Sequence, residues 1–167
     1  NLRPGATVID GTVGHGGHAA AILEATGPDG RLLGLDRDQA SLAIAQERLS
    51  QFGSRCLLKL GRFSQLGELY PQTPFADHPV EAILLDLGLA SSQLLDPTRG
   101  FSFQHPDAPL DMRFQPDGPT AADLLNTLPR QKLIDILSEY GDEQFAGPIA
   151  ASIVSVRQKQ IFTSVQQ

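Results

Sequence analysis

Short apolar runs, each flanked by turn residues, recur along the first half of the chain. They lie at residues 7–10, 31–35, 56–60 and 81–85, and three of them end on or directly before an aspartate. Continuous apolar runs of this length are typical of strands that are buried on both faces. We therefore predict four strands, with acidic side chains at the ends of the first, second and fourth.

Segments with a helical period separate these runs. We predict one helix at residues 18–25 and a second at residues 39–52, where apolar side chains recur on one face before Gly53. Strands that alternate with helices indicate a parallel α/β sheet.

The composition and the hydrophobic pattern of the sequence change after the fourth apolar run. Residues 87–119 contain many prolines and glycines and follow no period. An irregular stretch of this length in a compact domain is usually functional, so we interpret it as a substrate loop. We divide the chain into an α/β domain at residues 1–119 and a helical domain at residues 120–167.

Two helices are expected in the last part of the chain. Apolar residues from Leu133 to Tyr140 recur at helical spacing, and Gly141 closes this predicted helix. A second helix is expected to begin at Asp142 or Pro148 and to end near Lys159.

Composition narrows the class of protein. The 167-residue chain has a formal net charge of −6, which excludes a broad basic surface for nucleic acid. Cys56 is the only cysteine, which excludes an internal disulfide and favours a reducing compartment, so we expect a cytoplasmic protein. The sequence contains neither an apolar run long enough for a membrane span nor a charged-then-apolar leader, so we expect no membrane segment and no signal peptide.

The two ends indicate that the chain is part of a longer protein. The first residue is Asn1, and the only methionine is Met112. Thr163 and Ser164 have the character of a helix N-cap, yet only Val165 to Gln167 follow them. We therefore expect truncation at both ends.

The strongest local feature is a glycine-rich loop at residues 10–18 (Asp-Gly-Thr-Val-Gly-His-Gly-Gly-His), between the first strand and the first helix. Glycines let the backbone approach a ligand closely, and a strand end beside a helix N-terminus forms a ligand crevice. The alternative is a glycine-rich turn that binds no ligand.

The ligand class depends on Asp10. Gly14, Gly16 and Ala19 fit a loose dinucleotide fingerprint, which would indicate a nicotinamide cofactor. The carboxylate of Asp10, however, would repel the two phosphates of a dinucleotide. It suits a ligand with an ammonium and a sulfonium group, and S-adenosylmethionine carries both without a phosphate.

Residues after the other strands fit parts of that ligand. Asp36 can accept hydrogen bonds from both ribose hydroxyls, with Asp38 as the helix cap. Phe63 can stack on a purine, although a phenylalanine more often lies in the core. Asp86 and Gln93 can orient a substrate amino group or hold the ammonium of the cofactor, and Asp86 can equally serve as a cap.

Residues 98–105 and 109–113 combine arginine and phenylalanine with polar residues. This combination can clamp phosphates and stack bases of RNA. The alternative is a lid in which Phe101 and Phe103 pack inward. The four histidines and the single cysteine lack metal-ligand spacing, so we predict no metal site.

Several motifs occur together in an order that resembles one family. They are residues 10–18, Gly34-x-Asp36-x-Asp38, Leu85-Asp-Leu-Gly88 with Ser91 and Gln93, Arg99-Gly-Phe-Ser-Phe103, Pro109-Leu-Asp-Met-Arg113 and Tyr140-Gly-Asp-Glu143. The chain resembles the MraW or RsmH family of bacterial 16S ribosomal RNA cytosine-N4 methyltransferases over nearly its whole length. The blocks at 99–103 and 109–113 are far more specific than the glycine loop.

The resemblance implies a fold, a reaction and a site. The fold is a partial Rossmann-like class I methyltransferase sheet, parallel and of order 3-2-1-4, with the start of a helical inserted domain. The reaction is methylation of N4 of cytosine 1402 in 16S rRNA of the small ribosomal subunit by S-adenosylmethionine. The implied cofactor-binding residues are Gly16, Gly17, His18, Asp36, Phe63, Asp86 and Gln93, and the implied substrate-binding residues are Arg99, Phe101, Asp111 and Arg113. No catalytic residue is assigned, and Asp86 is expected to lie nearest the methyl group.

The sequence departs from the family in three places. Ala90 replaces a usual serine, and Gly147-Pro148 replaces charged helix formers, so the last helix is expected to begin with Pro148. The family's lead-in and its return to the sheet are not found, which would leave the fourth strand as an unpaired edge. We therefore expect the chain alone to bind cofactor weakly and to have little activity, and the full-length protein to form a homodimer.

The net charge of −6 restricts how the chain can bind RNA. Two other functions also remain as alternatives. RNA contact is expected at local basic residues, namely Arg62, Arg99, Arg113, Arg157 and Lys159. One alternative is a nicotinamide-dependent oxidoreductase. The other is an inactive truncated fragment that serves as a binding module.

Overall fold

The computed structural model describes residues 2–167, apart from the side chains of Ser91 and Ser92. The chain forms two compact units, one ending at Gly88 and the other running from Leu89 to Gln167. Residues 89–119, which the sequence analysis grouped with the α/β domain, belong to the second compact unit. Their service as a substrate loop stays a prediction.

The first unit is built on a four-stranded sheet. Its strands are β1 (Thr7–Asp10), β2 (Arg31–Asp36), β3 (Cys56–Leu60) and β4 (Val80–Leu84). All three pairings are parallel, and the order is β3-β2-β1-β4. The predicted fold class, strands and strand order are therefore confirmed.

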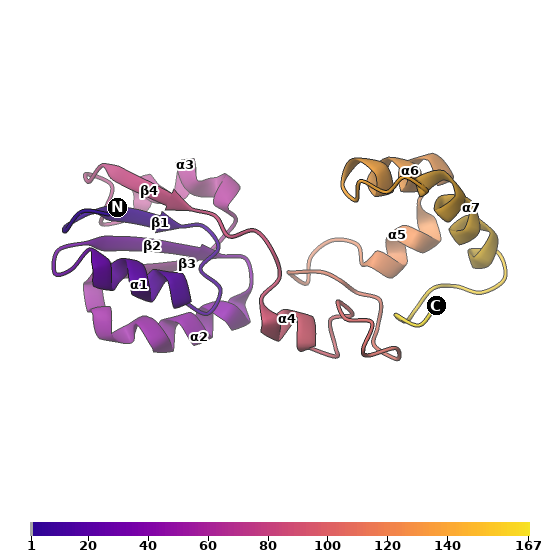
Figure 1. Ribbon diagram of the computed structural model, residues 1–167, viewed down its shortest axis with the longest axis horizontal. Coiled ribbons are helices and arrows are strands. Elements are labelled where there is room, and N and C mark those ends of the chain that lie inside the picture. Colours follow the sequence, from indigo (N-terminus) through magenta and orange to yellow (C-terminus); the bar gives the residue numbers. More distant parts are fainter. Residues whose placement is uncertain (1) are drawn as a thin grey trace. The chain divides into compact units, whose positions relative to one another are not determined.

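Helices cover both faces of this sheet (Figure 1). On one face, α1 (Gly17–Ala25) and α2 (Gln39–Leu49) enclose a buried cluster that includes Leu23, Leu32 and Leu49. On the other face, Leu33, Leu35 and Phe75 form a second cluster with side chains from α3 (Leu66–Leu69). This two-sided burial explains why the strands are continuously apolar.

The second predicted helix is shorter than expected. The α-helix ends at Leu49, and a 3₁₀ segment, Ser50–Arg55, follows it. Gly53 interrupts that segment with φ +56°, a conformation that glycine adopts without a steric cost. The continuous helix expected to Phe52 is therefore wrong, and so is the expected C-cap at Gly53, because the C-cap of α2 is Ser50.

The second unit contains four helices among its described residues. They are α4 (Ser91–Leu95), α5 (Ala121–Thr127), α6 (Arg130–Glu139) and α7 (Ala146–Arg157). Of these, α4 and α5 were not predicted from the sequence. Neither these helices nor any others in the described part of the chain are long and apolar enough to cross a membrane.

One expectation about the end of the chain is wrong. Pro148 is the third residue of α7 and not its first, a position that is still tolerated because N–H groups of the first turn have no intrahelical acceptor. Further along, Ser164 forms an antiparallel bridge with Pro109, and the carbonyl of Thr163 accepts the N–H of Leu110 at 3.0 Å.

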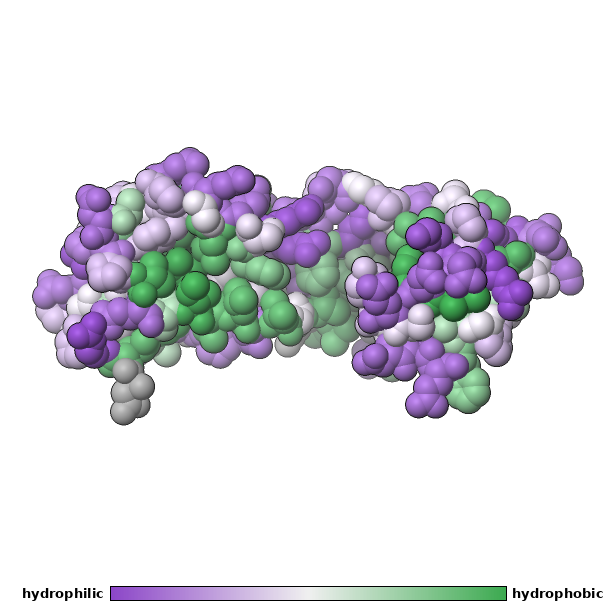
Figure 2. All heavy atoms as spheres, turned by 90° about the horizontal axis from the view of Figure 1, so that it is seen from above, coloured by the Kyte–Doolittle hydropathy of each residue, from purple (hydrophilic) through white to green (hydrophobic). Residues whose placement is uncertain are grey.

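The strand β4 lies at the end of the described sheet and pairs only with β1 there, as predicted. Ile83 is 55% exposed, and Leu85 and Leu87 beyond the strand are also exposed. Figure 2 shows apolar side chains gathered on a surface of the first unit.

Candidate functional site

The glycine-rich loop connects three strand ends of the first unit. The N–H of Gly11 donates to the carbonyl of Leu84 at the end of β4, and the N–H of Val13 donates to the carbonyl of Leu35 in β2, both at 2.9 Å. Gly14 and Gly16 have positive φ angles of +51° and +79°. The left-handed conformation at Gly16 starts α1, and a Cβ there would lie 3.0 Å from a methyl carbon of Leu49. Glycine is therefore required at this position by the backbone and by packing.

Asp10 is buried at the end of β1. Its side chain belongs to a residue that is 1% exposed; Oδ1 accepts the N–H of Thr12 at 3.1 Å. Oδ2 is buried and accepts no hydrogen bond among the described residues. Burial raises the pKa of this carboxyl, with smaller contributions in the same direction from Asp36 and Asp86, while the Thr12 N–H and His18 oppose the rise. The loop therefore surrounds a buried carboxyl group whose ionised form is disfavoured.

Asp36 holds the glycine loop from the end of β2. Its Oδ2 accepts the N–H of Gly14 at 2.8 Å, and its Oδ1 accepts the N–H of Asp38 at 2.9 Å. Each oxygen keeps one further lone pair, so ribose hydroxyls can still donate to it. Asp38 itself caps α2 by accepting the N–H of Ala40, which confirms its predicted role.

Asp86 and His18 face each other at the same edge of the sheet. The Nδ1 atom of His18 lies 3.8 Å from Oδ2 of Asp86, and their side chains are 63% and 68% exposed. The N–H of Asp86 donates to Oγ1 of Thr12 at 2.7 Å. Thr12 was not among the predicted site residues, because this contact joins residues 74 positions apart and has no local sequence signal.

Phe63 lies beside the glycine loop. A Cβ added at Gly11 would be 3.0 Å from the Cβ of Phe63 and 2.5 Å from Cδ2 of Leu85. Phe63 is 41% exposed, so part of the residue is open to solvent. With Gly16, Gly17, His18, Asp36 and Asp86, the structure brings six of the seven predicted cofactor-binding residues to one unit.

Gln93 belongs to the second unit. It is 7% exposed, and its Oε1 accepts the N–H of Ala90 at 3.0 Å, across the first turn of α4. Its predicted contact with the cofactor stays a prediction.

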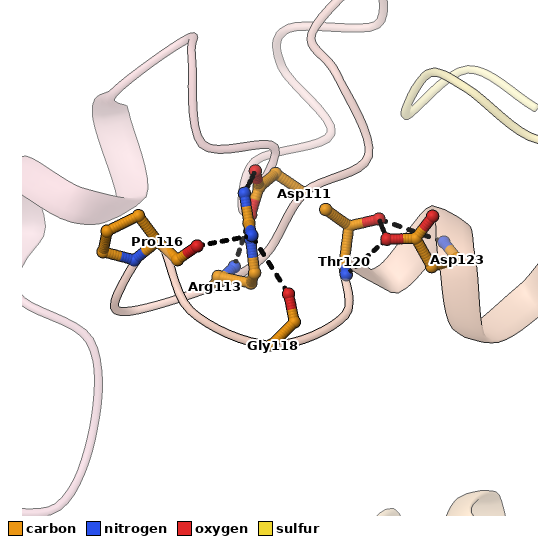
Figure 3. A network of polar contacts seen from close by, with 6 residues as sticks. All are labelled: Asp111, Arg113, Pro116, Gly118, Thr120 and Asp123. Atoms are coloured by element: carbon orange, nitrogen blue, oxygen red, sulfur yellow. Dashed lines mark hydrogen bonds and ion pairs between the residues drawn. The ribbon is translucent and has the colours of Figure 1, made fainter.

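The predicted substrate residues Asp111 and Arg113 are used within their own loop (Figure 3). Two nitrogens of Arg113 donate to the two carboxylate oxygens of Asp111, both at 2.8 Å, and Nη1 donates to the carbonyls of Pro116 and Gly118. The hydrogen bond from Arg113 lowers the pKa of Asp111. This fork-shaped contact shapes the loop before any substrate is present.

The Arg99-Gly-Phe-Ser-Phe103 block divides its aromatic rings between inside and outside. Phe101 contacts Phe114 with ring centroids 5.5 Å apart, whereas Phe103 is 86% exposed. The lid with both rings packed inward is therefore wrong, whereas the contact of this block with RNA stays a prediction. Arg99 pairs with Asp96, with Nε 3.4 Å from Oδ2.

Arg157 and Cys56 both lie in surroundings that favour a structural role. Nη1 of Arg157 donates to the carbonyls of Leu125 and Leu128 at the end of α5, so this predicted RNA contact serves as a helix cap. Burial raises the pKa of the Cys56 thiol to about 11, which makes it a poor nucleophile. Within the described residues, no three potential metal ligands gather.

The fold and this edge define the class of protein. A parallel sheet of order β3-β2-β1-β4, with a glycine loop before α1 and acids at the ends of β1, β2 and β4, defines a Rossmann-like domain, a class in which ligands bind at the carboxyl ends of the strands.

Comparison with known proteins gives the family. The model of the MraW methylase family matches residues 1–167. Ribosomal RNA small subunit methyltransferase H of Syntrophotalea carbinolica is 48% identical over 166 residues, 99% of this chain and 52% of that protein. The protein of the same name from Geobacter sulfurreducens is 49% identical over 156 residues, 93% of this chain and 49% of that protein. The chain belongs to the MraW methylase family, and the resemblance seen in its motifs is confirmed.

The matches cover only part of each relative. The chain spans about half the length of the curated relatives it matches. A solved SAM-dependent methyltransferase from Aquifex aeolicus aligns with 84% of this chain and 74% of its own, at 17% identity and a TM-score of 0.39, which is too low to add to the family assignment.

Proposed function

We propose that this chain carries the S-adenosylmethionine site of an enzyme that methylates N4 of cytosine 1402 in 16S rRNA of the small ribosomal subunit. The observation that carries the proposal is the set of carboxyl groups of Asp10, Asp36 and Asp86 around one glycine loop. The relatives named as small-subunit rRNA methyltransferases support the substrate class.

The electrostatics of the loop favour a cationic ligand over a dinucleotide. Asp36 and Asp86 both oppose ionisation of the buried Asp10 carboxyl, so the site already holds an excess of negative charge. Two phosphates would add to that repulsion, whereas an ammonium and a sulfonium group would relieve it. This argues against the nicotinamide-dependent alternative.

The residues of the first unit fit the parts of the cofactor. Asp36 can accept the ribose hydroxyls, and the exposed part of Phe63 can stack on the adenine. Asp86 and His18 lie together at the end where β4 leaves the sheet. S-adenosylmethionine supplies an electrophilic methyl group when it is bound.

Asp86 is proposed to serve the substrate amine. Its carboxylate can accept a hydrogen bond from the N4 amino group of cytosine and so direct the nitrogen lone pair. The amine needs orientation and the later loss of one proton, which water or this carboxylate can accept.

RNA contact is proposed to rely on few ion pairs. Arg99, Arg113 and Arg157 already bind groups within the second unit. We therefore expect a shallow dependence of RNA affinity on salt concentration, because few phosphates are neutralised.

Cofactor binding is tested by titration calorimetry on the chain itself. We expect S-adenosylmethionine to bind, because its cationic groups offset the negative charges of Asp10, Asp36 and Asp86. Adenosine, which lacks both cations, should bind more weakly. Binding of NADH with enhanced fluorescence, and no heat from S-adenosylmethionine, would support the oxidoreductase instead.

The reaction is tested on 30S subunits that lack the modification. The natural protein carrying this chain is incubated with them and with S-adenosylmethionine, and the digested RNA is analysed by mass spectrometry. We expect N4-methylcytidine at a single site, whereas methylation on another atom or no methylation would contradict the proposal. The same assay on the 167-residue chain tests the expectation that it has little activity alone.

A further inference from the structure

The first unit contains a side-chain hydrogen bond where a backbone one is expected. The parallel ladder between β1 and β4 pairs Asp10 with Leu84 and continues with the N–H of Gly11 on the carbonyl of Leu84. The next N–H of a parallel ladder, that of Asp86, would reach a backbone carbonyl of the facing strand. Here it donates to Oγ1 of Thr12 at 2.7 Å.

The loop turns away from β4 at this point, which is why the hydroxyl takes over. Thr12 is also fixed from its own backbone, because its N–H donates to Oδ1 of the buried Asp10. The close approach of Gly11 to Leu85, where a Cβ would come within 2.5 Å, brings the loop and the end of β4 together. Thr12 is therefore fixed by its own N–H, and its hydroxyl oxygen in turn fixes the backbone of Asp86.

We propose that Thr12 is a positioning residue for methyl transfer, which acts by holding the backbone of Asp86 so that the Asp86 carboxylate faces His18 and the methyl end of the site. This inference rests on the proposed function, because Asp86 is given its part in cofactor and amine binding there. Thr12 acts through Asp86, because its hydroxyl oxygen accepts the backbone N–H of that residue.

The placement predicts a selective effect. Thr12→Val keeps the shape of the side chain but removes the acceptor, so the end of β4 loosens while Asp36 and Phe63 keep their places. A net loss of one hydrogen bond corresponds to about a tenfold change in an equilibrium. We therefore expect the advantage of S-adenosylmethionine over adenosine in binding to fall about tenfold, with adenosine affinity unchanged.

The experiment compares Thr12→Val with Thr12→Ser and with Thr26→Val. Serine keeps the acceptor and should restore the binding ratio and the methylation rate to within about threefold of the parent. Thr26 donates its hydroxyl to the carbonyl of Ile22 at the far end of α1, so Thr26→Val reports the general effect of losing a threonine hydroxyl in this unit. Amide exchange of Asp86, followed by NMR, should accelerate in Thr12→Val alone.

The outcomes separate the two proposals. If the unsubstituted protein (the parent) binds no S-adenosylmethionine, the proposed function is wrong. If the parent binds and methylates, and Thr12→Val keeps the same ligand ratio, rate and Asp86 amide exchange, the role of Thr12 is overturned. Equal losses for S-adenosylmethionine and adenosine in Thr12→Val would overturn it too, because they would indicate general damage to the unit.

Discussion

The backbone N–H of Gly14 donates a 2.8 Å hydrogen bond to Oδ2 of Asp36, 22 residues further along the chain. One carboxylate thus fixes the glycine loop and also lies at the strand end where a ribose is expected. The loop conformation is therefore formed by the protein itself, and a ligand that uses Asp36 meets a preformed site.

Asp36→Asn should weaken cofactor binding by about tenfold or more. The N–H groups of Gly14 and Asp38 use different oxygens of Asp36, so in the asparagine variant one of them would face the amide NH2 group. Hydrogen bonds to a charged group contribute roughly 1.5–3 kcal/mol. Calorimetric titration with S-adenosylmethionine measures the loss. The control is Asp38→Asn, because asparagine also caps helices well, and its affinity should stay within about threefold. Equal affinities of both variants for S-adenosylmethionine would show that Asp36 does not bind the cofactor.

The buried Asp10 should make the fold less stable as the pH rises. Its pKa in the folded state lies above the ordinary value of 3.8, so above that pH the unfolded chain loses the proton first. The free energy of unfolding of the parent, relative to Asp10→Asn, should therefore fall as the pH increases from about 4 towards neutrality. Urea denaturation at a series of pH values measures the difference.

Asp111→Asn gives a control of the opposite sign. The pKa of Asp111 is lowered by Arg113, so its contribution is present above the ordinary value and is lost as the pH falls through the folded-state pKa. The parent should gain stability over Asp111→Asn as the pH rises through that acid range. If the stability difference from the parent changed with pH in the same direction for both variants, the opposite pKa shifts of Asp10 and Asp111 would be contradicted.

The sequence predicted the first unit well because its signals are local. Apolar runs that end in Asp10, Asp36 and Asp86 identify buried parallel strands and place their acids on one edge, since parallel strands share a carboxyl end. The helix α5 was missed although Thr120 and Asp123 form a capping box that could have indicated it.

The second unit was predicted less well because its contacts are distant in sequence. Asn126 binds the backbone of Phe162 through both amide atoms, at 2.8 and 2.9 Å, and this fixes the end of the chain. The use of Arg113 within its own loop likewise depends on the path of residues 116–118. Residue type and spacing alone do not distinguish such an arginine from one that binds RNA.

Gly100→Ala should disrupt the loop of the second unit. Gly100 has φ +70°, and a Cβ there would lie 2.1 Å from the carbonyl oxygen of Pro109. The left-handed conformation alone costs a residue with a Cβ roughly 1–2 kcal/mol, and the clash adds to it. Thermal unfolding should show a lower melting temperature. Gly147→Ala in α7 is the matched control, because nothing lies within 4 Å of its added Cβ, and it should be neutral or stabilising.

Arg113→Lys separates a structural role from a charge contact with RNA. Lysine keeps the positive charge but cannot form two parallel bonds to Asp111 while also reaching the carbonyls of Pro116 and Gly118. We expect faster amide exchange across residues 111–120 and at least a several-fold loss of methylation, with the salt dependence of RNA binding unchanged. Arg130→Lys, at the exposed start of α6, should alter none of these quantities. If Arg113→Lys retains slow exchange and full activity, the fork to Asp111 does not shape the loop, and the positive charge alone accounts for the arginine.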